Sequence, residues 1–341
     1  MTFYFAYYGG KSREFNHIKH LIEAEKARKG DIEFVEPFCG SCATSLKVST
    51  EGLATSYRLN DIDQQLTAFL LDVRERRTSA RYFEYTTAQC VGMDRAKHKR
   101  LITEEKEDPL LTYFFRMKVY RFRRDLWHED LNGKQYKHDQ RKYLTADTFF
   151  SAPTTRITCQ DFRAVLEEYR TNDKAVLYLD PPYMDSFNAG YTTYDPTGGR
   201  SSDSTGLIID NTSMYIDILR FMQSCRCAVI MIINGNSLMR EVYSRFIVGE
   251  YKKAYVTTHI TKSKEGAKIQ KKHHTTHLLV YKPSTEVGNG RLRLKPMKKE
   301  GWHLDHGGLR HNLVYVDKLG RRYPTPEGAL RLQKDDEKTQ A

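Results

Sequence analysis

The segment from Asp31 to Val48, DIEFVEPFCGSCATSLKV, decides the fold class. It begins with a short apolar run that ends at Pro37, and a turn of small residues follows from Cys39 to Cys42. The next residues, ATSLKV, favour a helix. A strand, a tight turn and a helix in this order are typical of α/β proteins, so the segment predicts the first unit of a mostly parallel sheet.

The same alternation returns along the chain. Residues Ser56–Leu59 predict a second strand, which leads through Asn60-Asp61-Ile62-Asp63 into the apolar-periodic helix QQLTAFLLDV. The apolar runs KAVLYL, ending at Leu179, and AVIMII, ending at Ile233, predict two further strands. A parallel sheet binds its ligands at the carboxyl ends of its strands, so we look there for functional residues.

Two stretches depart from this alternation. Between about Arg74 and Thr155 the chain is charged and aromatic, and Asn132-Gly133 predicts a hairpin turn. The end of the chain is rich in Gly and Lys, with one hairpin expected from Leu313 to Tyr323. We therefore predict three parts: a discontinuous α/β domain of residues 1–73 and 156–283, a domain inserted at 74–155, and a basic extension at 284–341.

The composition is that of a soluble globular protein. Of 341 residues, 39% are apolar and 29% are charged, which allows a full core and about two domains. The longest apolar run, Cys227–Ile233, is far shorter than the roughly 18 residues of a membrane helix. The N-terminus does not resemble a signal peptide, and six irregularly spaced cysteines do not form a disulfide framework. We expect an intracellular protein with no membrane partner.

The net charge indicates a polyanionic partner. The 55 basic and 43 acidic residues give a formal charge of +12, and 20 basic but only 9 acidic residues lie between Lys252 and the end of the chain. Such an excess is typical of nucleic-acid-binding proteins. A basic surface kept for solubility explains the charge alone equally well.

The tetrapeptide Asp180-Pro181-Pro182-Tyr183, which closes a predicted strand, carries the clearest chemistry. Two prolines cannot continue a sheet, so they hold an extended turn that displays an acid and an aromatic ring. The Asp180 carboxylate and the Pro181 carbonyl can accept the two hydrogens of an exocyclic amino group, while Tyr183 stacks on the ring that carries it. In the simpler alternative, the prolines only end the strand and the tyrosine is a surface residue.

The acidic turn at Asp61 and Asp63 has two interpretations. A carboxylate at the end of the second strand can hold a ribose diol, or the turn can simply cap the following helix. The preceding loop has Cys42 where a dinucleotide-binding fingerprint would have glycine, which argues against a pyrophosphate cofactor. The cysteine and histidine spacings favour no zinc site, so no metal is expected.

Taken in order, five segments resemble one family. They are Tyr7-Tyr8-Gly9-Gly10-Lys11, Glu36-Pro37-Phe38-Cys39-Gly40, Asn60-Asp61-Ile62-Asp63, Gln160-Asp161-Phe162 and Asp180-Pro181-Pro182-Tyr183. Over roughly residues 4 to 282 the sequence is similar to the Dam-type (D12 class) DNA adenine-N6 methyltransferases of the alpha group. The resemblance implies a Rossmann-like catalytic domain that uses S-adenosylmethionine, and an inserted target-recognition domain.

The resemblance also implies roles for individual residues. Seven would bind S-adenosylmethionine, with Asp61 on the ribose hydroxyls: Tyr7, Lys11, Phe38, Gly40, Asp61, Asp161 and Phe162. Four would grip a flipped adenine and align its amino group for direct methyl transfer: Asp180, Pro181, Pro182 and Tyr183. In the insert, arginines interleaved with aromatic residues suit contact with phosphates or guanine edges, and the hairpin suits a groove, although each residue singly can also be a solvated charge. The DNA-binding candidates are Arg116, Arg121, Arg123, Arg124, Asn132 and Lys134. The sequence departs from the family at Cys42, where many members have glycine.

The implied function is site-specific methylation of adenine N6 in double-stranded DNA, with a cognate restriction nuclease as a candidate partner. Methylation of cytosine N4 or of RNA adenine is an alternative, because the same corner grips any exocyclic amino group. A catalytically idle nucleic-acid-binding protein of the same fold is another. The basic segment Lys262–Pro283 precedes the family's last strand, so we expect it to form a charged loop that contacts phosphates.

Overall fold

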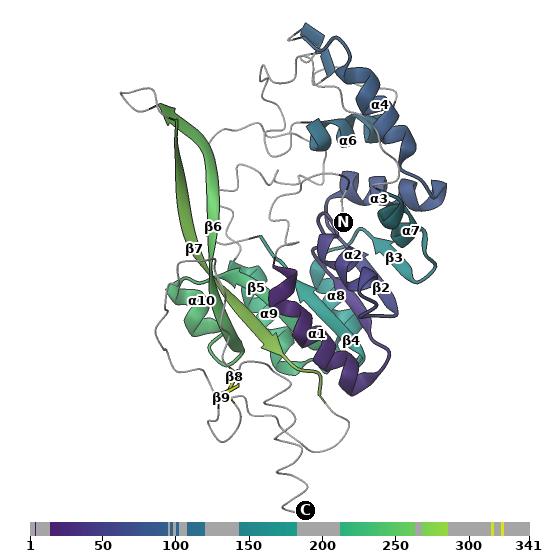
Figure 1. The fold of residues 1–341 in the computed structure, drawn as a ribbon. Helices are drawn as coiled ribbons and strands as arrows, with labels where there is room; N and C mark the ends of the chain where they lie inside the picture. The colour runs from purple at the N-terminus through teal and green to yellow at the C-terminus, as the bar shows by residue number, and fades with distance from the viewer. Residues whose placement is uncertain are drawn as a thin grey trace, which may run out of the picture. The chain divides into compact units, whose positions relative to one another are not determined.

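The computed structural model describes residues 4, 14–94, 96–97, 100–101, 108–119, 143–182, 212–262, 268–285, 315–316 and 322–323 (Figure 1). The chain divides into two compact units. Unit 1 comprises Met1–Asn16, Asp31–Glu168 and Phe187–Ile209, and unit 2 comprises His17–Gly30, Tyr169–Ser186 and Asp210–Ala341.

Three parallel strands form the centre of unit 1. They are β1 (Glu33–Glu36), β2 (Ser56–Asn60) and β3 (Thr155–Thr158), in the order β3-β2-β1. In register, Tyr57 of β2 lies opposite Phe34 on one side and Thr155 on the other. Each strand leads into a helix: α2 (Ala43–Thr50), α3 (Gln64–Arg76) and α8 (Phe162–Tyr169). The two strand-turn-helix units predicted from the sequence are confirmed.

Helices from the stretch predicted to be an insert pack around Tyr4, the first described residue. They are α4 (Ala80–Cys90), α6 (Pro109–Val119) and α7 (Leu144–Ser151). The ring of Tyr4 lies 5.6 Å from that of Phe69 in α3 and 5.7 Å from that of Phe150 in α7. Phe83 of α4 stacks on Tyr143 at 4.1 Å. Tyr4 is thus buried in an aromatic core that these helices build. The hairpin expected at Asn132-Gly133 lies outside the described residues.

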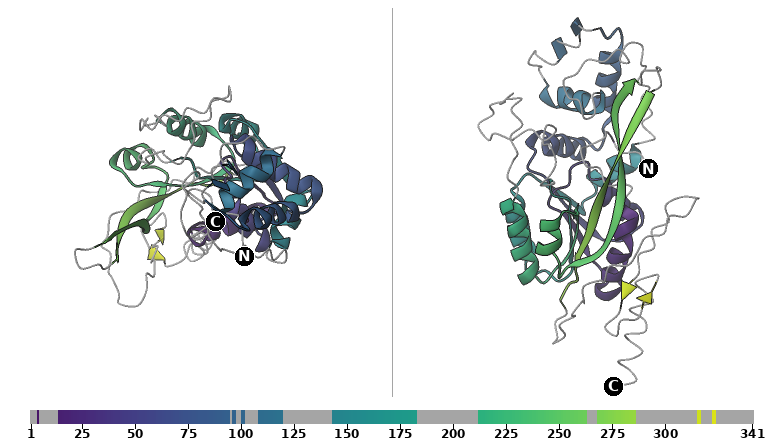
Figure 2. Two further views of the ribbon diagram at one scale, coloured as in Figure 1. Left: turned by 90° about the horizontal axis from the view of Figure 1, so that it is seen from above. Right: turned by 90° about the vertical axis from the view of Figure 1, so that its left-hand side faces the viewer.

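Unit 2 contains parallel and antiparallel strands. β4 (Ala175–Leu179) and β5 (Ala228–Asn234) are parallel, β7 (Lys268–Lys282) runs antiparallel to β5, and β6 (Ile247–Lys262) runs antiparallel to β7. β4 is buried throughout and β5 nearly so, as their apolar runs predict. α1 (Phe15–Lys29) covers one face of these strands, and α9 (Thr212–Ser224) and α10 (Ser237–Val242) cover the other (Figure 2).

The strand order β3-β2-β1-β4-β5-β7-β6 defines a mixed seven-stranded sheet, so the predicted α/β, Rossmann-like fold class is confirmed. A separate antiparallel pair, β8 (Tyr315–Val316) and β9 (Arg322–Tyr323), confirms the hairpin predicted near the end of the chain. No helix in the described part of the chain is long and apolar enough to cross a membrane.

The prediction of a charged loop over Lys262–Pro283 is wrong for most of that segment. Residues Lys268–Lys282 form β7, which pairs with β6 from Lys262 opposite Lys268 to Ile247 opposite Val280. The facing strands are rich in Thr, Val, Ile and Tyr, which favour a pleated strand. Scattered basic residues do not prevent backbone pairing, so the charge alone was a poor guide to local structure.

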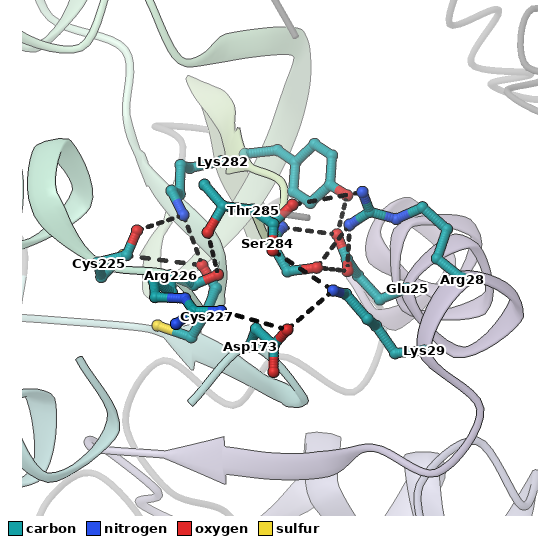
Figure 3. Close-up of polar contacts among 11 residues, drawn as sticks. Glu25, Arg28, Lys29, Asp173, Cys225, Arg226, Cys227, Lys282, Ser284 and Thr285 are labelled. Carbon is teal, nitrogen blue, oxygen red and sulfur yellow. Dashed lines mark hydrogen bonds and ion pairs between the residues drawn. The ribbon is translucent and has the colours of Figure 1, made fainter. Parts of the chain in front are cut away.

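Buried polar contacts fix the carboxyl end of β7 within unit 2 (Figure 3). The ammonium of Lys282 donates to the carbonyls of Cys225 at 2.7 Å and Cys227 at 2.9 Å. The Glu25 carboxylate of α1 accepts hydrogen bonds from the Tyr281 hydroxyl at 2.5 Å and the Ser284 hydroxyl at 2.7 Å. Because a buried charge is costly unless it is paired, these contacts hold the end of β7 in one arrangement.

Candidate active site

The loop after β1 in unit 1 is shaped by Glu36 and Gly40. The buried Glu36 carboxylate accepts a hydrogen bond from the Ser45 backbone N–H at 3.2 Å and another from the Ser45 hydroxyl. It thereby provides an acceptor for a backbone N–H in the first turn of α2, where such groups lack partners within the helix. The chain turns sharply at Gly40, whose φ of 45° is accessible to glycine without strain.

Cys42 adopts a left-handed conformation, with φ 54° and ψ 21°. This geometry explains why glycine suits the position, because a β-carbon disfavours the left-handed region. The Cys42 N–H donates to the Cys39 carbonyl at 2.6 Å, and the Cys42 side chain is fully buried. The departure from the family pattern therefore preserves a tight turn and adds a small apolar group beneath it.

Asn60, the last residue of β2, ties together the loops that follow three strands. Its fully buried side-chain amide donates to the carbonyls of Pro37 at 3.0 Å and Gln160 at 2.9 Å. Its amide oxygen accepts hydrogen bonds from the Thr158 hydroxyl at 2.9 Å and the Gln160 N–H at 3.0 Å. Since Pro37 follows β1 and Gln160 follows β3, one side chain fixes the spacing of all three loops.

Asp61 joins the end of β2 to the loop after β1. Its carboxylate accepts hydrogen bonds from the Gly40 N–H at 2.9 Å and the Asp63 N–H at 3.0 Å. Burial raises the pKa of Asp61 to about 6, although these backbone hydrogen bonds act in the opposite direction. Each carboxylate oxygen has a second lone pair, so the ionised group retains the capacity to accept ligand hydroxyls.

The two interpretations of the acidic turn apply to different residues. Asp63 is the N-cap of α3, because its carboxylate accepts hydrogen bonds from the N–H groups of Gln65 and Leu66. Asp61 makes no cap contact of this kind among the described residues and instead holds the Gly40 loop. Capping therefore accounts for Asp63 and leaves Asp61 as the candidate ligand-binding acid.

An aromatic pair completes the site in unit 1. The rings of Phe38 and Phe162 lie 5.1 Å apart, and the Arg163 guanidinium lies 4.6 Å from the centre of the Phe162 ring. The Asp161 carboxylate accepts a hydrogen bond from the Arg163 backbone N–H at 2.8 Å. Five predicted donor-binding residues are thus gathered at the carboxyl ends of β1, β2 and β3: Phe38, Gly40, Asp61, Asp161 and Phe162.

The Asp180-Pro181-Pro182 turn ends β4 in unit 2. Asp180 is partly buried and Pro181 is buried. The Pro182 carbonyl accepts a hydrogen bond from the Tyr215 hydroxyl of α9 at 3.1 Å, and the Tyr215 carbonyl accepts one from the Tyr243 hydroxyl at 2.6 Å. Side chains therefore hold this turn where proline prevents strand pairing.

Other predicted residues lie outside the described part of the chain: Tyr7, Lys11, Tyr183, Arg121, Arg123, Arg124, Asn132 and Lys134. Arg116 is partly buried on α6. The segment that carries Tyr7 follows a fixed point, because the Tyr4 hydroxyl donates to Asp147 at 2.5 Å and its carbonyl accepts from Lys118 at 2.6 Å.

The sequence reasoning missed supporting residues that the structure places in the site. Asn60 and Glu36 are fully or almost fully buried polar residues. Each is a polar residue at the end of an apolar strand, and this sequence feature could have indicated a buried hydrogen-bonding role. Tyr215 had no sequence signal, because its contact with Pro182 depends on how α9 packs.

A family model described as D12 class N6 adenine-specific DNA methyltransferase matches residues 7–106 and 122–259. A search of curated proteins finds no match. Among solved structures, the rRNA methyltransferase aviRa from Streptomyces viridochromogenes is 12% identical, with 79% of this chain and 84% of that chain covered and a TM-score of 0.32. Precorrin 8w decarboxylase from Methanobacterium thermoautotrophicum is 10% identical, with 78% and 89% covered and a TM-score of 0.31.

Proposed function

Because the chain belongs to the D12 class of N6 adenine-specific DNA methyltransferases, we propose that it methylates the N6 amino group of an adenine in duplex DNA, with S-adenosylmethionine as the donor. The observation that carries this proposal is the Asp180-Pro181-Pro182 turn at the end of the buried strand β4, held by Tyr215. It presents an acid and a backbone carbonyl, the two acceptors that an amino group with two hydrogens requires.

The residues at the ends of β1, β2 and β3 suit the donor. Asp61 offers carboxylate oxygens to the ribose hydroxyls, and the Phe38–Phe162 pair offers an apolar surface beside the Gly40 loop. Tyr7 and Lys11 extend this set in the proposal. Bound S-adenosylmethionine supplies a methyl group on a positively charged sulfur, which makes the methyl carbon electrophilic. No nucleophilic cysteine is required for this chemistry.

On the acceptor side, Asp180 and the Pro181 carbonyl accept the two amino hydrogens of adenine. These hydrogen bonds draw the N6 lone pair out of conjugation with the ring and direct it toward the methyl carbon. Tyr183 stacks on the base. A base in a duplex must leave the stack to reach such a turn, at a cost of a few kcal/mol, and Arg116 with the other predicted insert residues would hold the surrounding duplex.

The proposal is tested by identifying the methylated product. Purified protein is incubated with labelled S-adenosylmethionine and unmodified duplex DNA, the DNA is digested to nucleosides, and the methylated nucleoside is identified by mass spectrometry. We expect N6-methyladenine. N4-methylcytosine, or methylation of RNA but not DNA, would contradict the proposed substrate, and donor binding with no methylated nucleoside in either polymer would favour an idle binding protein.

Donor affinity is expected to rise with pH through about 6. The pKa of Asp61 in the folded protein is about 6, so at pH 5 most of this carboxyl is protonated and binds ribose hydroxyls less well. If binding needs the ionised form, titration calorimetry should give affinity roughly tenfold weaker at pH 5 than at pH 7.5. Asp61→Asn is the control, with weak binding that changes little with pH. An affinity in the natural protein that is flat across this range would contradict the role of Asp61.

A further inference from the structure

β6 and β7 continue well beyond the sheet as a two-stranded ribbon. β5 pairs with β7 only from His277 to Lys282. The pairing of β6 with β7 extends further, from Lys252 opposite Thr276 to Lys262 opposite Lys268, with a register shift between Val256 and Ile260. We call residues 252–262 and 268–276 the ribbon. Figures 1 and 2 show it leaving the sheet as a long twisted pair of strands.

The ribbon is anchored at its base. At the base, Tyr251 and His277 are register partners and both are buried, and the contacts of Lys282 fix the following end of β7. Along its length, no other strand among the described residues pairs with the ribbon. A two-stranded hairpin is marginally stable in water by itself. The far end of the ribbon would therefore gain stability from a partner.

The charge of this element identifies that partner as a polyanion. One acid, Glu265, lies between residues 252 and 276, together with seven lysines: Lys252, Lys253, Lys262, Lys264, Lys268, Lys271 and Lys272. At the far end Lys262 and Lys268 are register partners, so the sequence places two of these lysines opposite each other at the end of the ribbon.

We propose that the ribbon is a second DNA-binding element, separate from the insert, that lies in the major groove of the substrate duplex. This inference rests on the proposed function for its DNA substrate. The major groove is about 12 Å wide and admits a two-stranded ribbon. At about 3.3 Å per residue the ribbon is roughly 30 Å long, close to one turn of B-DNA. The deep, narrow major groove of an RNA duplex would not admit it.

The test removes charge from the far end and measures DNA affinity by fluorescence anisotropy across salt concentrations. For the variant K262Q/K268Q we expect at least a tenfold rise in the dissociation constant, and a fall of roughly 2 in the slope of log K against log salt. The matched control is R156Q/R220Q, because these side chains are 60% and 75% exposed and lie on other elements. Equal affinity loss in both variants, or none in the ribbon variant, would overturn the proposal.

A second variant shortens the ribbon without touching the sheet. Lys253 and Thr275 are register partners, so they can be joined by an Asn-Gly turn that retains Tyr251, His277 and all pairing with β5. Protection of guanine N7 from dimethyl sulfate reports major-groove occupancy. We expect the shortened protein to lose protection over several base pairs while its thermal stability and S-adenosylmethionine affinity stay unchanged. Unaltered protection would contradict docking in the groove.

These readouts separate this inference from the proposed function. Anisotropy and guanine protection need no methyl transfer, so a protein that binds DNA through the ribbon but methylates no adenine would refute only the proposed reaction. If the protein methylates DNA normally and its ribbon variants bind DNA like the control, only the proposed DNA-binding role of the ribbon is refuted. Equal loss of affinity for an RNA duplex would show a general phosphate contact and overturn the major-groove assignment.

Discussion

Replacing Asp180 by Ala is expected to reduce methyl transfer by about 10²–10³-fold or more, the usual loss when a group aimed at the reacting centre is removed. In the proposal, its carboxylate accepts one of the amino hydrogens and so orients the N6 lone pair. Asp180 follows Leu179, the last residue of β4, and is only partly buried, so we expect the D180A protein to fold. Single-turnover transfer of labelled methyl groups to duplex DNA measures the effect, and near-normal turnover would remove Asp180 from the mechanism.

Two controls show whether the loss of methyl transfer in D180A comes from the reaction step or from misfolding. The D180A protein should bind S-adenosylmethionine with unchanged affinity and melt within a few degrees of the natural protein. The conservative variant Tyr215→Phe removes the hydrogen bond to the Pro182 carbonyl and keeps the ring, so it should lower the turnover rate by about tenfold and stability by about 1 kcal/mol. If D180A also loses donor binding and melts far lower, the residue supports the fold instead.

The core strands were predictable because their signals are local. Ala175–Leu179 and Ala228–Asn234 are short apolar runs closed by Pro, Asn or Gly, and a strand buried on both faces needs little more than this. The Asp61 and Phe38 positions followed from motif order. A glycine in a motif also indicates the backbone conformation of the loop. Cys42 occupies a position where glycine would have been expected, and its backbone is left-handed.

Contacts between distant segments were not predictable in the same way. The Asn60 side chain joins Pro37 and Gln160, which are far apart in the sequence and meet only because β1, β2 and β3 are neighbours. Tyr215 reaches Pro182 through the packing of α9. The length of β7 was missed because a basic run was taken for a loop, although its register with β6 depends on pairing that charge does not reveal.

Asn60→Ala is expected to lower the free energy of unfolding of unit 1 by roughly 3–5 kcal/mol, because each buried group left unsatisfied costs about 1–3 kcal/mol. The change removes four hydrogen bonds and leaves the carbonyls of Pro37 and Gln160 and the Gln160 N–H without this partner. Urea unfolding measures the loss, with S-adenosylmethionine binding followed on the same protein. Thr158→Val is the matched control, since it removes only one of the four bonds and should cost about 1 kcal/mol.

The Asn60→Ala variant also shows whether Asn60 stabilises only the fold or also the arrangement of the donor-binding loops. Asn60 fixes the loops that carry Phe38, Asp61 and Phe162, so loosening them should weaken donor binding even at a temperature where the protein remains folded. We expect at least a tenfold loss of S-adenosylmethionine affinity in N60A and a change of less than threefold in T158V. A folded N60A protein that binds the donor normally would show that the three loops keep their arrangement without the Asn60 side chain. Other contacts, such as the backbone bond from the Cys39 N–H to the residue-60 carbonyl and the Asp61–Gly40 contact, would then hold the site.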